Sequence, residues 1–247
     1  MFYSYLGCLV RLKECGKLDD LEEISGASAG ALCSFVYLLG MGDTHKLVTE
    51  CINQDLSKMG INIKNFIKHY GFISEDVSRN YIGEFCFKFS GKYDITFKEL
   101  YEKTKIKLHV SAFSLDKYAV EYFSVDTAPN MSVVDAVSMS LSVPFIFAPY
   151  KNHIDGSVSE DIPYSPFMGQ DPNDVFVINS LNNERIKEPK SLYSYIVNFL
   201  EIFYTIRHKC PIVYPGVCVP VDINILNFKL TNEMRCKLYA RGYALFI

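Results

Sequence analysis

A serine between two glycines is the strongest chemical signal in the sequence. Gly26-Ala27-Ser28-Ala29-Gly30 follows a short segment centred on Ile24 and precedes the apolar stretch Ala31–Leu39. This order predicts a strand, a tight turn and a buried helix, which together hold a serine hydroxyl above a sheet. The N-terminus of the helix would offer free N–H groups, that of Ala29 among them, to a developing oxyanion. The pattern therefore indicates Ser28 as a candidate nucleophile.

The two glycines of the motif are expected to be steric requirements. We predict that strand and helix approach too closely at Gly26 and at Gly30 to leave room for a Cβ atom. The alternative interpretation of the motif is an ordinary glycine turn between a strand and a helix.

A serine hydroxyl is a weak nucleophile and needs a base. Asp155 is the candidate, because it ends the predicted strand Tyr150–Ile154 and is followed by Gly156. A carboxylate there could reach a nucleophile at another strand end of the same sheet. His153 is a rival base, since residues two apart on a strand point to the same side. The alternatives are an ordinary Asp-Gly hairpin turn and a structural, hydrogen-bonded histidine.

A conventional esterase with the order Ser, Asp, His is a further possibility. It requires a histidine after the acid, and His208 is the only histidine that follows Asp155. It also requires several strands before the nucleophile, whereas only one short strand is predicted before Ser28. The sequence therefore favours a site without that triad.

Strands and helices alternate along the chain, which predicts an α/β fold with a mostly parallel central sheet. Helices are expected at 4–15, 31–39, within 44–70, and at 95–104, 133–141, 191–206 and from 231 to the end; strands are expected around 24 and at 108–113, 119–125, 150–154 and 175–178. No repeat or Pro/Gly/Ser-rich linker divides the chain. Residues 1–247 are therefore expected to form a single domain.

Composition excludes some classes of partner. The chain carries 25 basic and 28 acidic residues, a net charge of −3, so it lacks the basic field typical of nucleic-acid binding. The first residues resemble no signal peptide, and no run of about eighteen apolar residues predicts a transmembrane helix. Eight cysteines without C-x-x-C pairs favour reduced thiols. We therefore expect a cytoplasmic protein that could contact membranes peripherally.

The apolar helix predicted at 191–206 has two interpretations. It could lie against lipid, since aromatic and aliphatic residues occur along its whole length. Burial in the core is the favoured alternative, because these residues spread over more than one face.

Several segments together resemble the patatin-like phospholipase family. The similarity includes Tyr3–Leu9, Ile24–Leu32, the stretch Val133–Pro149 with Ser138 and Ser140, Asp155-Gly156-Ser157, Asp161-Ile162-Pro163, and the tail from Phe228 to Tyr243. It is strong near the two motifs and loose at 41–105 and 181–226. The resemblance implies a three-layer α/β/α fold.

The resemblance also implies a chemistry. Ser28 would attack an ester carbonyl to form an acyl-enzyme, and Asp155 would act as base without a histidine. Substrates would be phospholipids or other glycerolipids, and no metal or other cofactor would be needed. The alternative is a catalytically weakened or inactive relative that binds lipid or a partner.

Two departures from the family pattern stand out. The aspartate motif usually has Gly or Ala in its third place, where this chain has Ser157; the residue stays small. The family also places a buried strand and a glycine-rich oxyanion loop directly before the helix that begins near Tyr3. Because the sequence lacks them, it predicts an N-terminally truncated domain with an unpaired sheet edge and few oxyanion donors. The alternatives are a catalytically weakened relative that still binds lipid and a chain in which another segment supplies the missing donors.

Overall fold

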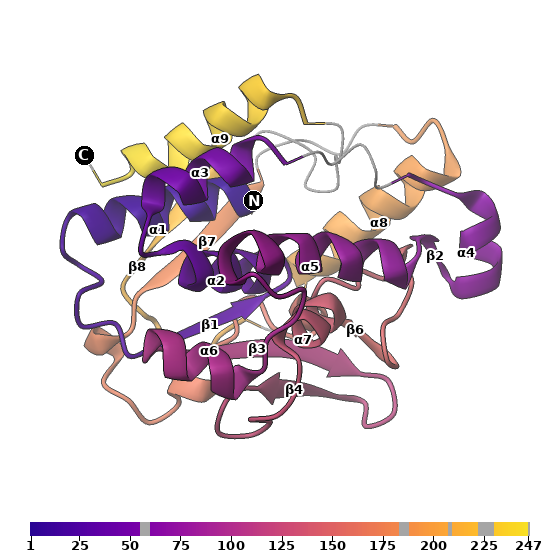
Figure 1. Cartoon of the computed structure of the whole chain (residues 1–247). Coiled ribbons are helices and arrows are strands. Elements are labelled where there is room, and N and C mark those ends of the chain that lie inside the picture. Colours follow the sequence, from indigo (N-terminus) through magenta and orange to yellow (C-terminus); the bar gives the residue numbers. More distant parts are fainter. Residues whose placement is uncertain (55–59, 183–187, 207–208, 222–229, 247) are drawn as a thin grey trace.

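The computed structural model describes residues 1–54, 60–182, 188–206, 209–221 and 230–246 (Figure 1). Its helices are α1 (Phe2–Glu14), α2 (Ala29–Gly40), α3 (Thr44–Ile52), α4 (Ile63–His69), α5 (Glu75–Ser90), α6 (Phe97–Thr104), α7 (Val133–Ser140), α8 (Leu192–Ile206) and α9 (Asn232–Ala244). Its strands are β1 (Glu23–Ala27), β2 (Gly71–Ile73), β3 (Lys107–Ser114), β4 (Ala119–Phe123), β5 (Phe145–Phe147), β6 (His153–Asp155), β7 (Val177–Asn182) and β8 (Gly216–Val221).

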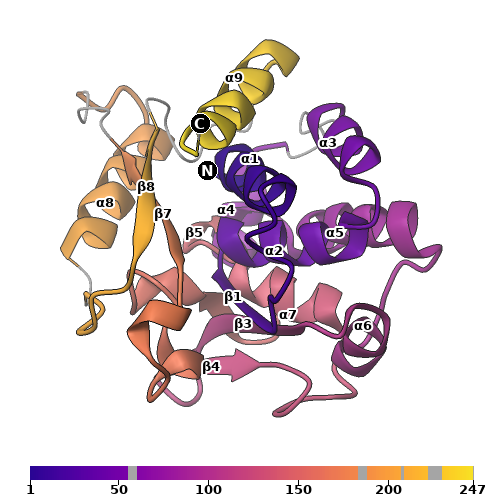
Figure 2. The same ribbon diagram turned by 90° about the vertical axis from the view of Figure 1, so that its left-hand side faces the viewer.

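The predicted α/β fold is confirmed, with mixed strand directions. β3 pairs with β1 in parallel and with β4 and β6 in antiparallel orientation. β2 pairs with β5, and β7 with β8, both in parallel. Parallel pairings thus outnumber antiparallel ones in the described part of the chain. Figure 2 shows β7 and β8 between α8 on their outer side and α1 on their inner side, which gives three layers there.

The main core surrounds α2. All residues of this helix from Ala31 to Gly40 are buried, as expected of a helix that is apolar all round. They pack with residues of α1, α5, α7 and β3 in one cluster of buried side chains. The prediction of a buried helix directly after Ser28 is confirmed.

The two ends of the described chain meet through α1 and α9, which lie side by side (Figure 1). A Cβ atom at Gly7 would fall 2.2 Å from the Tyr239 carbonyl oxygen, and one at Gly242 would fall 1.9 Å from the Ser4 carbonyl oxygen. The two glycines therefore let the helix backbones touch. The beginning of the family resemblance in the tail, residues 228–229, lies outside the described residues.

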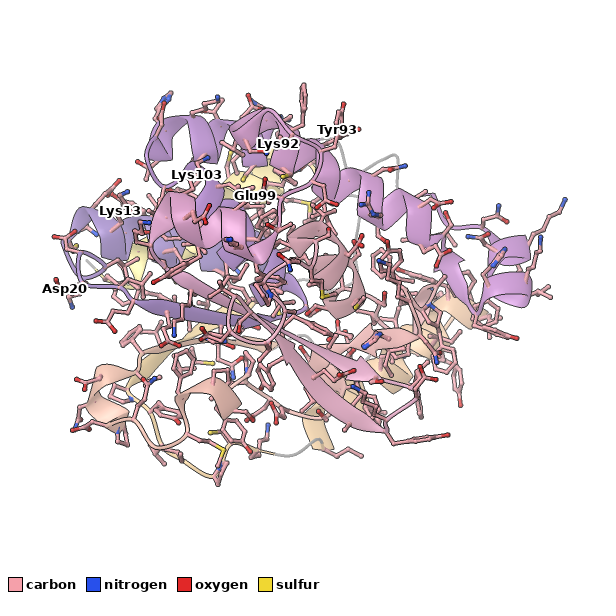
Figure 3. The ribbon with its side chains drawn as sticks, turned by 60° about the horizontal axis from the view of Figure 1, so that its bottom comes forward. Lys13, Asp20, Lys92, Tyr93, Glu99 and Lys103 are labelled. Atoms are coloured by element: carbon pink, nitrogen blue, oxygen red, sulfur yellow. The ribbon has the colours of Figure 1, made fainter. Side chains whose placement is uncertain are left out.

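Capping residues fix the start of the helix α6. The Thr96 hydroxyl accepts a hydrogen bond from the Glu99 N–H, and the Glu99 carboxylate accepts one from the Thr96 N–H. Lys92 reaches the same carboxylate at 2.8 Å (Figure 3). The Lys92 ammonium and the Thr96 N–H lower the pKa of Glu99 to about 2. This local network fixes the point at which α6 begins.

One predicted strand is shorter in the structure. The sequence favoured a strand over Tyr150–Ile154, but β6 begins only at His153. Lys151 and Asn152 have φ angles of 46° and 58°, and the Tyr150 and His153 backbones pair across them. Two successive positive φ angles make a tight hairpin turn. Residues 150–153 therefore form a turn that leads into the short strand ending at Asp155.

Candidate active site

Ser28 lies at a strained turn between β1 and α2. It directly precedes the first residue of α2 and has φ 53° and ψ −125°, a region that residues with a side chain rarely adopt. A Cβ atom at Gly26 would stand 2.5 Å from the Ala31 N atom, so strand and helix do touch there. The sequence predicted a tight strand-to-helix turn in which Gly26 leaves no room for a side chain, and both predictions are confirmed.

The second glycine of the motif has a different environment. A Cβ atom at Gly30 would meet nothing within 4 Å. The expectation that crowding excludes a side chain at Gly30 is therefore wrong. Gly30 is the second residue of α2, and its Cα faces open space because the helix has already turned away from β1.

Asp155 is a buried carboxylate with a fixed backbone. Asp155 is only 1% exposed. Its Oδ1 atom accepts a hydrogen bond of 2.7 Å from the Ser157 N–H, and its own N–H donates to the Ser142 carbonyl at 2.9 Å. A Cβ atom at Gly156 would lie 2.3 Å from the Ser111 carbonyl oxygen, so the chain after Asp155 is pressed against β3.

The strand register brings the two candidates to one place. β4 pairs with residues 110–114 along one edge of β3, so β1 and β6 must share the other edge. β1 ends with Ala27 opposite Ser111, and β6 ends with Asp155 opposite Ala112. The two strands run toward each other and meet end to end. Ser28 and Asp155 therefore lie at neighbouring positions along β3.

The end of α7 connects the two segments. The buried Ser140 hydroxyl accepts a hydrogen bond of 2.9 Å from the Ser28 N–H. Two residues later, the Ser142 carbonyl accepts the Asp155 N–H. In the sequence, Ser140 stands out only as part of the family resemblance, and no pattern there predicts this contact. Alternate serines at the end of an apolar helix were the available signal.

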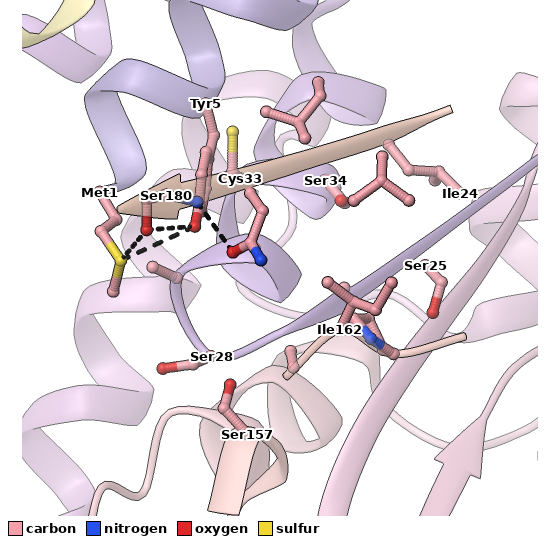
Figure 4. A pocket seen from close by; sticks show the side chains of 18 of the residues that line it. Met1, Tyr5, Ile24, Ser25, Ser28, Cys33, Ser34, Ser157, Ile162 and Ser180 are labelled. Atoms are coloured by element: carbon pink, nitrogen blue, oxygen red, sulfur yellow. Dashed lines mark hydrogen bonds between the residues drawn. The ribbon is translucent and has the colours of Figure 1, made fainter. Parts of the chain in front are cut away.

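A cavity of about 1500 Å³ opens over this point. Ser28, Asp155 and Ser157 line it together with apolar residues of β1, α2 and the segment after Asp155, among them Ile24, Leu32, Ile162 and Phe167. Figure 4 shows the Ser28 and Ser157 side chains at this cavity, with Ile162 close to β1. Residues of β1 and of β7 both contribute to its wall. Ser28 and Asp155 thus lie at a cavity whose lining is largely apolar.

The electrostatic field at Ser28 is favourable to negative charge. Ser28 precedes a helix of twelve residues whose first turn carries no acidic side chain, and the Ser28 side chain itself makes no capping hydrogen bond. Because the first N–H groups of a helix have no partner within the helix, those of α2 are available to an anion. Ala29 and Gly30 both line the cavity. The arrangement suits an oxyanion that forms beside the Ser28 hydroxyl.

Comparison with known proteins identifies the fold family. A sequence model described as patatin-like phospholipase matches residues 2–168. This chain belongs to the patatin-like phospholipase family. The matched region runs from α1 to just beyond the Asp155 segment, so it includes both candidate residues. The strands β7 and β8 and the helices α8 and α9 follow it.

Individual relatives agree with this family. The chain is 30% identical over 169 residues to the probable lipid hydrolase 463L of Invertebrate iridescent virus 6, covering 64% of this chain and 56% of that protein. The structure of VipD from Legionella pneumophila matches with a TM-score of 0.69 at 17% identity, over 98% of this chain and 63% of that chain. The type III effector protein ExoU of Pseudomonas aeruginosa matches with a TM-score of 0.51 at 16% identity, over 98% and 49%.

The patatin-like chain spans about half to two thirds of the length of these relatives. The two solved structures share its fold. The family and the viral protein connect the chain with lipid hydrolysis in general. In the described part of this patatin-like chain, no helix combines the length and apolarity needed to cross a bilayer.

His153 has partners of its own in this patatin-like fold. Its Nε2 atom lies 3.0 Å from a Glu121 carboxylate oxygen and its Nδ1 atom lies 2.6 Å from the Lys151 carbonyl. Burial raises the pKa of Glu121, but hydrogen bonds from Lys117 and His153 outweigh it and lower the pKa below its usual value. The interpretation of His153 as a hydrogen-bonded structural histidine is confirmed. His208 lies outside the described residues.

Proposed function

We propose that this chain hydrolyses carboxylic esters of phospholipids or other glycerolipids, with Ser28 as nucleophile and Asp155 as base. The meeting of β1 and β6 on one edge of β3 is the observation that carries the proposal, because it brings a strained serine beside a buried carboxylate. Family membership supports the substrate class. The apolar lining of the cavity suits an acyl chain.

In the first half of the reaction, the Ser28 Oγ atom attacks the ester carbonyl carbon and its proton passes to the Asp155 carboxylate. The resulting oxyanion faces the N–H groups at the start of α2, with Ala29 as the first donor. The intermediate then collapses. The bond to the leaving alcohol breaks, the proton on Asp155 passes to that alcohol, and the acyl group remains on Ser28.

In the second half, water attacks the acyl-enzyme and gives its proton to Asp155. Collapse of this second intermediate releases a fatty acid and returns the proton to Ser28. The Ser140 hydroxyl holds the Ser28 N–H throughout, so Ser140 positions the turn and does not touch the reacting atoms. Gly156 and Ser157 fix the carboxylate from its other side, through backbone contact with β3 and an N–H donor.

Release of fatty acid from phospholipid micelles tests the proposal. The parent chain should release fatty acid, and Ser28→Ala should reduce the rate at least about a thousandfold because it removes the nucleophile. Ser159→Ala is a matched control, since it also removes a serine hydroxyl close to the aspartate segment but outside the residues that line the cavity. A Ser28→Ala chain as active as its parent would contradict the proposal. A folded parent without activity would favour the catalytically inactive lipid-binding alternative.

A further inference from the structure

The helix α8 presents apolar residues on two opposite faces. Its inner face, with Ile196, Val197 and Leu200, is buried in a cluster that includes β2 and β5. Its outer face carries five large apolar side chains that are each at least half exposed: Leu192, Tyr195, Phe199, Ile202 and Ile206, at 54%, 60%, 51%, 50% and 74%. We call these five residues the α8 stripe. Burial, the favoured interpretation of this segment, therefore holds for the inner face alone.

The spacing of the α8 stripe makes it one continuous surface. Its members follow each other by three, four, three and four residues, which places them in a line along one side of the helix. An ordinary exposed helix face is polar, because apolar surface in water is unfavourable. Contiguous exposed apolar patches on soluble proteins usually mark a binding surface. Single exposed apolar residues would need no such explanation.

The helix α4 adds a second, basic element to this surface. None of its residues is buried, and Ile63, Ile67 and Tyr70 at its exposed side are 51%, 75% and 72% exposed. Lys64 and Lys68 stand between them, and the helix has no acidic residue. The surface of α4 thus combines apolar side chains with positive charge.

The two helices flank one aromatic residue. Phe66 of α4 stacks on Phe72 with ring centroids 4.6 Å apart, and Tyr193 of α8 meets the same ring edge-on at 5.5 Å. Figure 1 shows α4 and α8 at the same end of the molecule. Phe145, 42% exposed, lies 6.4 Å from the Phe66 ring and has a φ of 68°. The two helices therefore pack against one shared aromatic ring, and the exposed Phe145 lies beside α4.

The α8 stripe leads to the candidate active site. Ile202 and Ile206 are stripe residues that also line the cavity with Ser28 and Asp155. Beyond the helix, the Cys210 N–H donates to the Asp161 carboxylate at 2.8 Å, which ties this end of α8 to the segment after Asp155. A molecule seated on the stripe would therefore stand at the wall of the cavity.

From this continuity we infer that the α8 stripe, with α4 beside it, docks the protein on the surface of a lipid bilayer that contains anionic lipid. The choice of a bilayer rests on the proposed function, since the cavity at the end of the stripe would take a lipid ester. Stripe side chains enter the boundary between head groups and acyl chains, and Lys64 and Lys68 face lipid phosphates. An ester-bearing lipid then has a short apolar path into the cavity.

Vesicle binding by the full chain with Ser28→Ala tests the inference without consuming lipid. The probes are sedimentable vesicles of phosphatidylcholine alone and of phosphatidylcholine with phosphatidylserine. Phe199→Asp and Tyr195→Asp place a charge on the stripe away from the cavity, and each should weaken binding at least about fivefold. Tyr118→Asp is the matched control, because Tyr118 is an aromatic residue 83% exposed in the turn between β3 and β4. It should bind as the parent does.

A charge test separates the contribution of α4. Lys64→Glu with Lys68→Glu should weaken binding to vesicles with phosphatidylserine and leave binding to pure phosphatidylcholine nearly unchanged. Circular dichroism checks that each variant is folded. With Ser28 restored, the Phe199→Asp chain should hydrolyse a water-soluble short-chain ester as the parent does. Because binding is measured without chemistry, it succeeds or fails separately from the proposed hydrolysis.

Three outcomes would overturn the inference. The Ser28→Ala chain could fail to sediment with either vesicle, or Phe199→Asp and Tyr195→Asp could bind as tightly as Tyr118→Asp. Light scattering could also reveal a parent dimer that Phe199→Asp converts to a monomer with vesicle binding unchanged. That last result would assign the α8 stripe to a second copy of the chain.

Discussion

The segment that ends at Ser28 and the segment that ends at Asp155 lie beside each other on β3, but different contacts hold them. Ser28 stands on a strained backbone, and the contact of Gly26 with Ala31 and the hydrogen bond to Ser140 keep it there. Asp155 needs no strained backbone. Its carboxylate and its N–H are each held by a hydrogen bond, and Gly156 lies against β3.

This difference separates steric from chemical requirements. At Gly26 and Gly156 the backbone of another element occupies the space of a side chain. At Gly30 that space is open and belongs to the cavity wall. Glycines that look equivalent in a sequence motif therefore have two roles. One kind lets the chain fold, and the other leaves the site accessible.

The largest expected effect is the loss of hydrolysis rate when Asp155 is replaced. Asp155→Asn should lower the rate of ester hydrolysis about a thousandfold or more, because an amide cannot accept the serine proton. The Oδ1 atom of asparagine can still accept the Ser157 N–H, so the fold should persist. Initial rates and a thermal melt of both chains measure the two quantities. Retained activity in a folded variant would remove Asp155 from the role of base.

Substitutions of Gly26, Gly156 and Gly30 provide the sharpest test of the difference between glycines packed against backbone and a glycine that faces open space. Gly26→Ala and Gly156→Ala should each lower the free energy of unfolding by about 2–3 kcal/mol or prevent folding, since each new Cβ overlaps fixed backbone. Gly30→Ala should leave stability equal or raise it by up to about 1 kcal/mol, because alanine favours the helix. Urea unfolding measures all three. Equal losses for Gly30→Ala and Gly26→Ala would contradict the distinction.

Gly30→Ala should also affect activity while the protein stays folded. Its methyl group would enter the cavity beside the first N–H groups of α2, where the oxyanion of the proposed reaction forms. We expect a loss of about tenfold or more in kcat/KM for a phospholipid ester. A stable variant with full activity would show that the space over Gly30 is not used by substrate.

A smaller effect is expected where α7 connects the two segments. Ser140→Ala removes the acceptor of the Ser28 N–H and should lower kcat about tenfold, with a loss of about 1 kcal/mol in stability. Ser138→Ala is the matched control, because the buried Ser138 hydroxyl donates to the Val134 carbonyl within the same helix. Its kcat should match that of the parent. Equal losses in both variants would mean that Ser140 acts on stability alone.

The last expected effect is a pH-dependent change in stability, with no change in activity, at the opposite end of α7. Burial raises the pKa of Asp135, but hydrogen bonds from Lys151, Arg79 and Tyr150 outweigh it and lower the pKa below its usual value. The charged form therefore stabilises the fold at pH above the unfolded pKa of about 3.9, and this contribution is lost as pH falls through the lower folded pKa.

Unfolding by urea at several pH values tests this contribution. Near pH 6, Asp135→Asn should be less stable than the parent by about 1–2 kcal/mol. The difference should shrink below about pH 4 as Asp135 of the parent gains a proton. Asp116→Asn is a control on an exposed carboxylate of the turn between β3 and β4. A parent–variant difference that stays constant down to pH 3 would contradict the account of Asp135.

Much of the fold could be predicted because local patterns are strong. The apolar run after Ser28 became α2, and Thr231 caps α9 as expected, its hydroxyl accepting the Met234 N–H. The helix α5 was not predicted, although Ser74 and Gly91 are ordinary start and stop residues. Gly83 lies in its middle and interrupts the apolar pattern, and the packing of α5 on α2 and α7 stabilises the helix despite this glycine.

The site could be predicted only in its residue types. Motif spacing indicated Ser28 and Asp155, but their meeting depends on β1 and β6 sharing one edge of β3, which no local pattern encodes. The Ser140 contact spans 112 residues and was equally out of reach. The open space at Gly30 depends on how α2 leaves β1. Long-range pairing decided the meeting of Ser28 with Asp155 and the contact with Ser140.

Labelling with a fluorophosphonate probe tests the central claim most directly. The probe forms a covalent bond only with an activated serine, and mass spectrometry of the digested chain identifies the residue. We predict that the label appears on the peptide containing Ser28, that Ser28→Ala abolishes it and that Asp155→Asn reduces it strongly. A folded parent that stays unlabelled, or a label on another serine, would contradict the proposed nucleophile.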